Sequence, residues 1–469
     1  MNIQKSVVFS ITRTSFTIAR GFIFIYLITT QLSESAYGLW SVIFTIIITT
    51  VSIGGLHLNG SLIRFINKSG KRNQVFSDIM FIISVIYVII FIILSTSLKY
   101  FTNLDVNFII IILALVFIEL FIKIESTFYR ATHKVVYYES VQITKLLLDI
   151  VVFITAIEMG NGIQDGFYSL IISGTLVLIM LTYNLNSHII KPEFSNFDRY
   201  LRYGIPMVPR EASAQIIANT DRFLLLYYLS QEAVGIYVVC YTLSAMLQHI
   251  SSVLKPVLYP LVVDLWDQND QESLSEVYTK IFQVLSILLL PAGVGLALLA
   301  DDIILLTSTR LIATQSASLV PILLIGFIIK ALRDPLEFIF NARQENQLLA
   351  IYLITGSIIN VSLNIILIPR IGLVGAAWAT SAAHIVILFL LSYKVLSYIH
   401  LDLDYKMIMY SILSSVVMFI VISHIETQDP LLNIMLLPIL GGSCYFVLLY
   451  GVSRGQVKSM AENLRNHTQ

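Results

Sequence analysis

Long apolar segments separated by short polar connections recur along the whole chain of 469 residues. Each is long enough, as a helix, to cross a hydrocarbon core of about 30 Å. Because lipid offers no water to the backbone, such a segment is expected to be helical. The pattern predicts an all-α polytopic membrane protein with about fourteen transmembrane helices. The expected spans are 7–31, 37–62, 76–98, 107–129, 138–158, 166–186, 203–229, 235–259, 279–300, 318–340, 349–368, 372–394, 407–424 and 431–453.

The basic residues of the connections fall mainly on one side of these spans. With the N-terminus in the cytoplasm, the outer connections carry only Lys99, Arg310 and Arg370. Cytoplasmic loops are enriched in Lys and Arg, so the bias predicts cytoplasmic N- and C-termini and an even number of spans. The longest outer connection is expected at 301–317, and none is long enough for a soluble domain.

An internal repeat adds an expectation about the domains. Residues 32–40 read LSESAYGLW and residues 229–237 read LSQEAVGIY, and the same shift places Arg13 on Arg210. Six spans per copy would relate the copies by an axis along the membrane normal, as in parallel-repeat transporters. The predicted domains are an N-terminal six-helix lobe at 1–197, a C-terminal six-helix lobe at 198–400, two additional helices at 401–453 and a cytoplasmic tail at 454–469.

Composition narrows the function classes. Hydrophobic residues make up 57% of the chain and charged residues 12%, and the formal net charge is zero. Nothing in that balance favours a nucleic-acid partner. The sequence holds no Gly-rich phosphate loop and no His/Cys cluster of metal-ligand spacing, and Cys240 and Cys444 are far apart. We expect no catalytic residue, no metal and no cofactor.

Charged residues inside the expected spans are the strongest functional signal. Lys330, Arg333, Asp334 and Glu337 have the spacing of one helical stripe. A charge at the centre of a spanning helix costs about 2.5–3.5 kcal/mol on insertion scales, so such residues usually face one another or a wet cavity. This stripe indicates either a ladder of ion pairs or the wall of a transport path.

The first expected span differs because it carries two arginines and no acid. Arg13 and Arg20 are two turns apart on one face, so the partner of each has to come from another helix, from water or from an anionic substrate. Opposite charges at i, i+4 also occur within the fourth and fifth spans. There, ion pairs that lock the helices together are as good an interpretation as a functional site. These pairs are Glu119 with Lys123 and Lys145 with Asp149.

Several motifs together resemble one family of exporters. Residues 204–209 read GIPMVP, followed by DRF at 221–223 and VGIY at 234–237, and they look like the seventh span of Wzx-type polysaccharide flippases. These belong to the multidrug/oligosaccharidyl-lipid/polysaccharide exporter superfamily. Arg13 with Arg20, followed by YGLW at 37–40, is similar to the first two spans of that family. Many such flippases have twelve spans, so the additional pair expected here is a departure.

The resemblance implies a function and a location. Its cargo would be an undecaprenyl-diphosphate-linked oligosaccharide, moved by alternating access from the cytoplasmic to the periplasmic leaflet of a bacterial inner membrane. The process served would be O-antigen (lipopolysaccharide) or capsule biosynthesis, with membrane lipid, a polysaccharide polymerase and chain-length proteins as partners.

Site residues follow from the cargo, because guanidinium groups bind phosphate through paired hydrogen bonds. The expected contacts to the anionic headgroup are Arg13, Arg20, Arg210, Lys330 and Arg333. The expected counter-charges or ion-coupling residues are Asp149, Asp221, Asp334 and Glu337.

Two alternatives remain open on the sequence. A multidrug antiporter of the same superfamily commonly has a carboxylate in the first span, and here none occurs before Glu34. A membrane glycan polymerase or ligase would need a substantial outer loop with catalytic residues, and 301–317 offers only Asp301, Asp302 and Arg310. Both therefore rank below the flippase.

Overall fold

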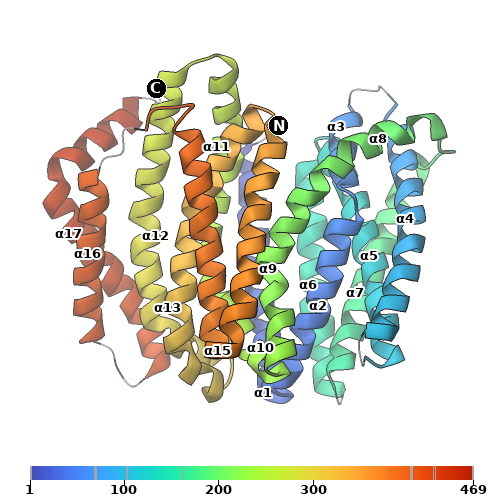
Figure 1. Ribbon diagram of the computed structural model, residues 1–469, viewed down its shortest axis with the longest axis horizontal. Coiled ribbons are helices and arrows are strands. Elements are labelled where there is room, and N and C mark those ends of the chain that lie inside the picture. Colours follow the sequence, from blue (N-terminus) through green and yellow to red (C-terminus); the bar gives the residue numbers. More distant parts are fainter. Residues whose placement is uncertain are drawn as a thin grey trace. The chain divides into compact units, whose positions relative to one another are not determined.

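The computed structural model is built of helices and describes residues 3–67, 71–101, 104–160, 162–401, 405–425, 427 and 429–466 (Figure 1). The chain forms two compact units, Met1–Gly235 and Ile236–Gln469. The all-α class predicted from the apolar pattern is confirmed.

The first unit holds the helices from the N-terminus to the first turn of α10. They are α1 Ile3–Gln31, α2 Glu34–Gly54, α3 Leu58–Phe65, α4 Arg72–Phe101, α5 Val106–Ala131, α6 Val135–Met159, α7 Ile163–Leu185, η1 Asn186–His188, η2 Phe194–Asn196, α8 Phe197–Gly204, η3 Ile205–Met207 and α9 Val208–Tyr228.

The second unit holds the rest of α10 and the helices that follow it. The bounds are α10 Gln231–Ala245, α11 Gln248–Asp267, α12 Gln271–Thr307, α13 Arg310–Arg333, η4 Asp334–Leu336, α14 Glu337–Ala342, α15 Asn346–Val395, α16 Tyr405–Ser423 and α17 Pro430–Asn466. The segment 301–317 expected as an outer connection is mostly helical, because α12 continues to Thr307 and α13 begins at Arg310; its place outside the membrane stays a prediction.

Within the described residues, eleven helices are long and apolar enough to cross a membrane. The number is twelve if α10 and the start of α11, which are bent by 45°, form one span. The chain is therefore a multi-pass membrane protein. The expected fourteen spans also counted α9, which does not qualify here, and divided α15 in two; that number stays a prediction.

Helix α15 is a hairpin although it is assigned as one helix of 50 residues. Ile371 and Gly372 have non-helical backbone angles, and Gly372 has φ 61°. Asn360 donates to Thr380 across 3.4 Å, 20 positions along the chain. An unbroken helix would hold these residues about 30 Å apart. The chain therefore reverses at 371–372, between the segments 349–368 and 372–394 expected from the sequence.

The boundary of the first unit lies after α9, whereas the sequence placed the end of its lobe at 197. Two side-chain bonds join α9 to α2: Arg222 to Thr45 at 2.7 Å and Gln215 to Ser52 at 3.3 Å. Helices α8 and α9 are thus part of the first unit. Whether the chain is built of repeated lobes stays a prediction. The expected tail continues α17 as far as Asn466, and 467–469 lie outside the described residues.

The two segments of the expected repeat meet at their glycines, within the first unit. A Cβ on Gly38 would lie in the carbonyl group of Gln231, and a Cβ on Gly235 would lie in that of Glu34. The contact is reciprocal, because the repeat places Gly38 on Gly235 and Glu34 on Gln231. Only glycine lets two helix backbones come this close.

Aromatic packing fixes the register of α1 against α6. Phe24 stacks on Phe153 with ring centroids 3.9 Å apart, and Trp40 of α2 stacks on Phe167 of α7 at 4.3 Å. Such ring pairs contribute about 0.5–1.5 kcal/mol beyond the area that they bury. One turn before Phe24 and Phe153 lie Arg20 and Asp149, so this aromatic layer holds both charged residues in place.

Gly372→Ala should lower the free energy of unfolding by about 1–3 kcal/mol, because alanine does not readily adopt the backbone angles of the α15 turn. Thermal unfolding of the purified protein in detergent measures this. Gly295→Ala is the matched control, since a Cβ at either glycine meets no atom within 4 Å and only Gly372 has a positive φ. Equal melting temperatures for the two variants would contradict a strained turn at Gly372.

Candidate functional site

A polar cavity lies inside the first unit between α1, α2, α5 and α6. Its volume is about 380 Å³. Helix α2 supplies a mainly apolar wall, with Ser52 as its polar member. The other helices supply charge. The charged residues of the lining are Arg13, Arg20, Glu119, Lys123 and Lys145.

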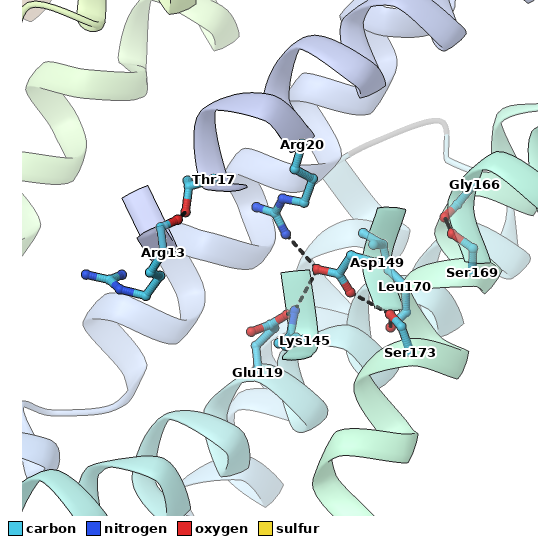
Figure 2. Close-up of polar contacts among 10 residues, drawn as sticks. All are labelled: Arg13, Thr17, Arg20, Glu119, Lys145, Asp149, Gly166, Ser169, Leu170 and Ser173. Carbon is cyan, nitrogen blue, oxygen red and sulfur yellow. Dashed lines mark hydrogen bonds and ion pairs between the residues drawn. The ribbon is translucent and has the colours of Figure 1, made fainter. Parts of the chain in front are cut away.

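The carboxylate of Asp149 organises the inner end of the cavity (Figure 2). It is fully buried, and its Oδ2 lies 2.6 Å from Nη1 of Arg20 and 3.1 Å from Nζ of Lys145. Its Oδ1 accepts a hydrogen bond of 2.6 Å from Ser173 of α7. Three helices are thus joined through one carboxylate, which is shielded from water on the side away from the cavity.

Two further ion pairs complete the charged lining. Nε of Arg13 lies 2.7 Å from Oε2 of Glu139, and Nζ of Lys145 lies 2.9 Å from Oε1 of Glu119. The side chain of Glu139 is 8% exposed and that of Glu119 is 34% exposed. Of the carboxylates in these pairs, only Glu119 lines the cavity.

The pairs of α1 with α6 explain how arginines are tolerated in the first span. Arg13 meets Glu139 and Arg20 meets Asp149, in the same order along both helices, so α1 and α6 run in the same direction. A buried charge left without its partner costs several kcal/mol, about 3–5 in measured cases. The missing counter-charge for the first span therefore comes from another helix.

The remaining expected residues of the first unit lie outside the cavity lining. Arg210 is half-buried on α9, next to Glu211, which contacts His57. Asp221 is buried on the same helix and accepts the backbone N–H of Arg222 at 2.9 Å. The structure thus brings Arg13, Arg20 and Asp149 into one site, without Arg210 and Asp221.

The charged stripe belongs to the second unit and pairs within itself. Lys330 lies 3.1 Å from Asp334, and Arg333 lies 3.7 Å from Asp334 and 3.9 Å from Glu337. Helix α13 ends at Arg333 and the chain continues through η4, yet the i, i+4 contacts predicted from the sequence persist. The ladder of ion pairs is therefore present. A role of the stripe as a wall of the substrate path stays a prediction.

Sequence reasoning missed part of the cavity. For the pairs of Glu119 with Lys123 and of Lys145 with Asp149, the sequence left a structural and a functional interpretation open. The pair of Lys145 with Asp149 is present, and Lys145 also bridges to Glu119 of α5. Two adjacent spans with opposite charges at the same spacing were the available signal. Glu139 gave no comparable signal, because it lies near the start of its helix, where a carboxylate is unremarkable.

Comparison with known proteins identifies the family. The family described as "Polysaccharide biosynthesis protein" matches residues 29–311. The chain belongs to this family.

Two curated relatives come from Haloferax volcanii. "Probable low-salt glycan biosynthesis flippase Agl15" is 24% identical over 265 residues, or 56% of this chain and 55% of that protein. "Probable flippase AglR" is 25% identical over 243 residues, 50% and 49% of the two chains. The chain thus spans about half the length of the curated relatives that it matches.

Solved structures establish the fold of this family member. "Lipid II flippase MurJ, inward closed conformation" superposes with a TM-score of 0.78 at 16% identity, covering 96% of this chain and 100% of that one. A multidrug resistance MATE family transporter of the MOP superfamily, in its inward-facing conformation, superposes with a TM-score of 0.68 at 15% identity. The match covers 82% of this chain and 95% of that one. The chain therefore shares its fold with both of these transporters.

A double-mutant cycle should show strong coupling between Arg20 and Asp149. Arg20→Gln and Asp149→Asn should each lower the unfolding free energy, and their combination should cost about 1–3 kcal/mol less than the sum. Asp149→Asn leaves Arg20 without its carboxylate, and Arg20→Gln leaves the buried carboxylate of Asp149 with Lys145 as its remaining cation. Thermal or denaturant unfolding in detergent provides the four values. Arg202 and Asp198, an exposed pair at 2.7 Å, are the control and should couple weakly. Additive effects at Arg20 and Asp149 would disprove the coupling.

Proposed function

We propose that this protein is a flippase for a lipid-linked oligosaccharide whose diphosphate group enters the cavity of the first unit. The observation that carries the proposal is the lining itself, in which Arg13, Arg20, Lys123 and Lys145 face a space of about 380 Å³ inside a membrane-spanning bundle. Membership of a polysaccharide biosynthesis family and the names of the two flippase relatives support it.

The chemistry of the lining suits a diphosphate. Guanidinium groups bind phosphate oxygens through paired hydrogen bonds, and ammonium groups add point charges. The cavity has the size of a small-molecule site, enough for a polar headgroup while a prenyl chain stays in lipid. Arg13 and Arg20 would bind the diphosphate, and Asp149 would neutralise Arg20 when no substrate is present.

The finer assignment follows the resemblance of the sequence. We propose an undecaprenyl-diphosphate-linked cargo, carried by alternating access from the cytoplasmic to the periplasmic leaflet of a bacterial inner membrane for O-antigen or capsule. The proposed partners are a polysaccharide polymerase and chain-length proteins. Arg210, Lys330 and Arg333 are further proposed headgroup contacts, with Asp221, Asp334 and Glu337 as counter-charges or ion-coupling groups.

For the topology we propose fourteen crossings with both termini in the cytoplasm. The reversal of α15 at Gly372 supports counting it as two spans. Helix α9 has 21 residues, enough to cross a membrane, and its polar side chains bond to α2.

The lining of the cavity argues against the multidrug antiporter, and the residues of α12 argue against the polymerase or ligase. A multidrug antiporter that takes organic cations would be expected to present an acidic pocket, and here four cations and one carboxylate line the space. A polymerase or ligase would need catalytic residues in an outer loop. The residues considered for that role, Asp301 and Asp302, lie in α12 and accept hydrogen bonds from Ser316 and Asn433. The MATE-like fold does not decide between carriers, because both kinds share it.

Arg20→Gln should reduce export of the lipid-linked glycan at least tenfold, because a charge-assisted hydrogen bond to the cargo contributes about 1.5–3 kcal/mol. Surface glycan and lipid-linked oligosaccharide retained in the inner leaflet are measured together, at matched amounts of membrane-inserted protein. Arg202→Gln, which removes an exposed arginine outside the cavity, should export normally. Normal export by Arg20→Gln would exclude Arg20 as the main headgroup contact.

The topology can be tested with single cysteines in a Cys240→Ser, Cys444→Ser background. Ser195→Cys lies in η2 and Asn107→Cys lies in the first turn of α5, and both positions are exposed. A membrane-impermeant maleimide added to intact cells should label residue 107 and not residue 195, because the proposed orientation places them on opposite sides. Labelling of residue 195 from outside would contradict the proposed orientation.

A further inference from the structure

The cavity contains its own anions, and these already neutralise its cations. Each cation of the lining faces a carboxylate of the first unit. The pairs are Arg13 with Glu139 at 2.7 Å, Arg20 with Asp149 at 2.6 Å, Lys145 with Glu119 at 2.9 Å and with Asp149 at 3.1 Å, and Lys123 with Glu211 through an electrostatic interaction.

An incoming anion therefore meets cations that already have carboxylate partners. Four cations are balanced by four carboxylates, so a diphosphate diester would bring two uncompensated negative charges into a cavity within an apolar bundle. Burying unbalanced charge is costly unless a group in the site changes its own charge or moves away. Protonation of one of the four carboxylates cancels one of the two added charges and leaves its cation available to the headgroup.

Geometry singles out Glu119 among the four. Asp149 is fully buried and holds three partners, and Glu139 is 8% exposed behind Arg13. Glu211 contacts His57 and does not line the cavity. Glu119 alone lines it, is 34% exposed, and has a single close partner, Lys145, which keeps Asp149 if Glu119 leaves.

The charged groups around Glu119 come from its own helix and from α1 and α6. Helix α2 contributes no charged side chain to the lining, and Ser173 of α7 bonds to Asp149. On α3, Arg64 lies over the ring of Tyr203, and on α4 Asp78 accepts from Gln74 and Tyr200. The charged groups that face Glu119 are Arg13 and Arg20 of α1, Lys123 of its own helix, and Lys145 and Asp149 of α6.

We propose that Glu119 is the exchangeable counter-ion of the cavity, and that it takes up a proton when an anionic headgroup binds to Lys145 and its neighbours. The inference rests on the proposed function and adds a coupling to it. Protonation removes the negative charge that would repel the headgroup, and it frees the ammonium group of Lys145 for the phosphate oxygens. Release of the cargo returns the proton and restores the pair of Glu119 with Lys145.

The test counts protons on the purified full-length protein in lipid nanodiscs. The probe is farnesyl-diphospho-N-acetylglucosamine, a diester with two negative charges, and the control probe is uncharged farnesyl N-acetylglucosaminide. Calorimetric titration at one pH, in two buffers of different ionisation enthalpy, gives the number of protons bound with each probe. Wild type should take up about one proton with the diphosphate and none with the uncharged probe, and its affinity should fall up to about tenfold per pH unit as pH rises.

Two variants locate the proton. Glu119→Gln should bind the diphosphate probe without proton uptake and with an affinity independent of pH. Glu119→Asp, which retains the carboxyl group at the same position, is the matched control and should keep the proton uptake.

Three results would contradict the inference. Binding of the diphosphate probe to wild type without proton uptake refutes it, and this measurement needs no variant to fold. Equal uptake by Glu119→Gln assigns the proton to another group. If the diphosphate probe binds no better than the uncharged one at any pH, the headgroup site of the proposed function fails, and the inference fails with it.

Discussion

The structure of the first unit depends on how charges are kept inside an apolar bundle. An arginine at bilayer depth is tolerated only with a partner, and Arg20 finds one in Asp149 of a helix more than a hundred positions away. The same carboxylate binds Lys145 and Ser173, so α1, α6 and α7 are joined where the cavity begins. Polar anchoring and the adjacent aromatic layer thus hold the same helices in the same register.

This arrangement separates the buried carboxylate from the accessible one. Asp149 is fully buried, and its removal would leave Arg20 without its carboxylate partner. Glu119 meets the same Lys145 from the side of the cavity. One lysine is therefore shared between a permanent partner and a replaceable one. A site of this kind can stay neutral in the membrane without substrate and still present cations to an anion.

The sequence predicted the helices well and their partners poorly. Apolar segments of crossing length follow from lipid thickness alone, so most spans, including both arms of α15, lie where they were expected. The stripe at Lys330 was also predictable, because i, i+4 contacts are local. The partner of Arg20 was not, since it depends on which helices are neighbours, and spacing within one helix carries no information about that. For the same reason Glu139 was overlooked, and of the two partners of Lys145 only Asp149, on its own helix, was predicted.

The glycine contact between residues 32–40 and 229–237 limits how the sequences of the two segments can diverge in evolution. If both derive from one ancestral sequence, Gly38 and Gly235 were once the same position, and each now faces the backbone beside the other. After a duplication, copies usually diverge independently. Here a methyl group gained on either side would collide with a carbonyl on the opposite helix, so neither copy can relax the constraint alone. The similarity of the two segments at Gly38 and Gly235 would then be preserved by a steric requirement.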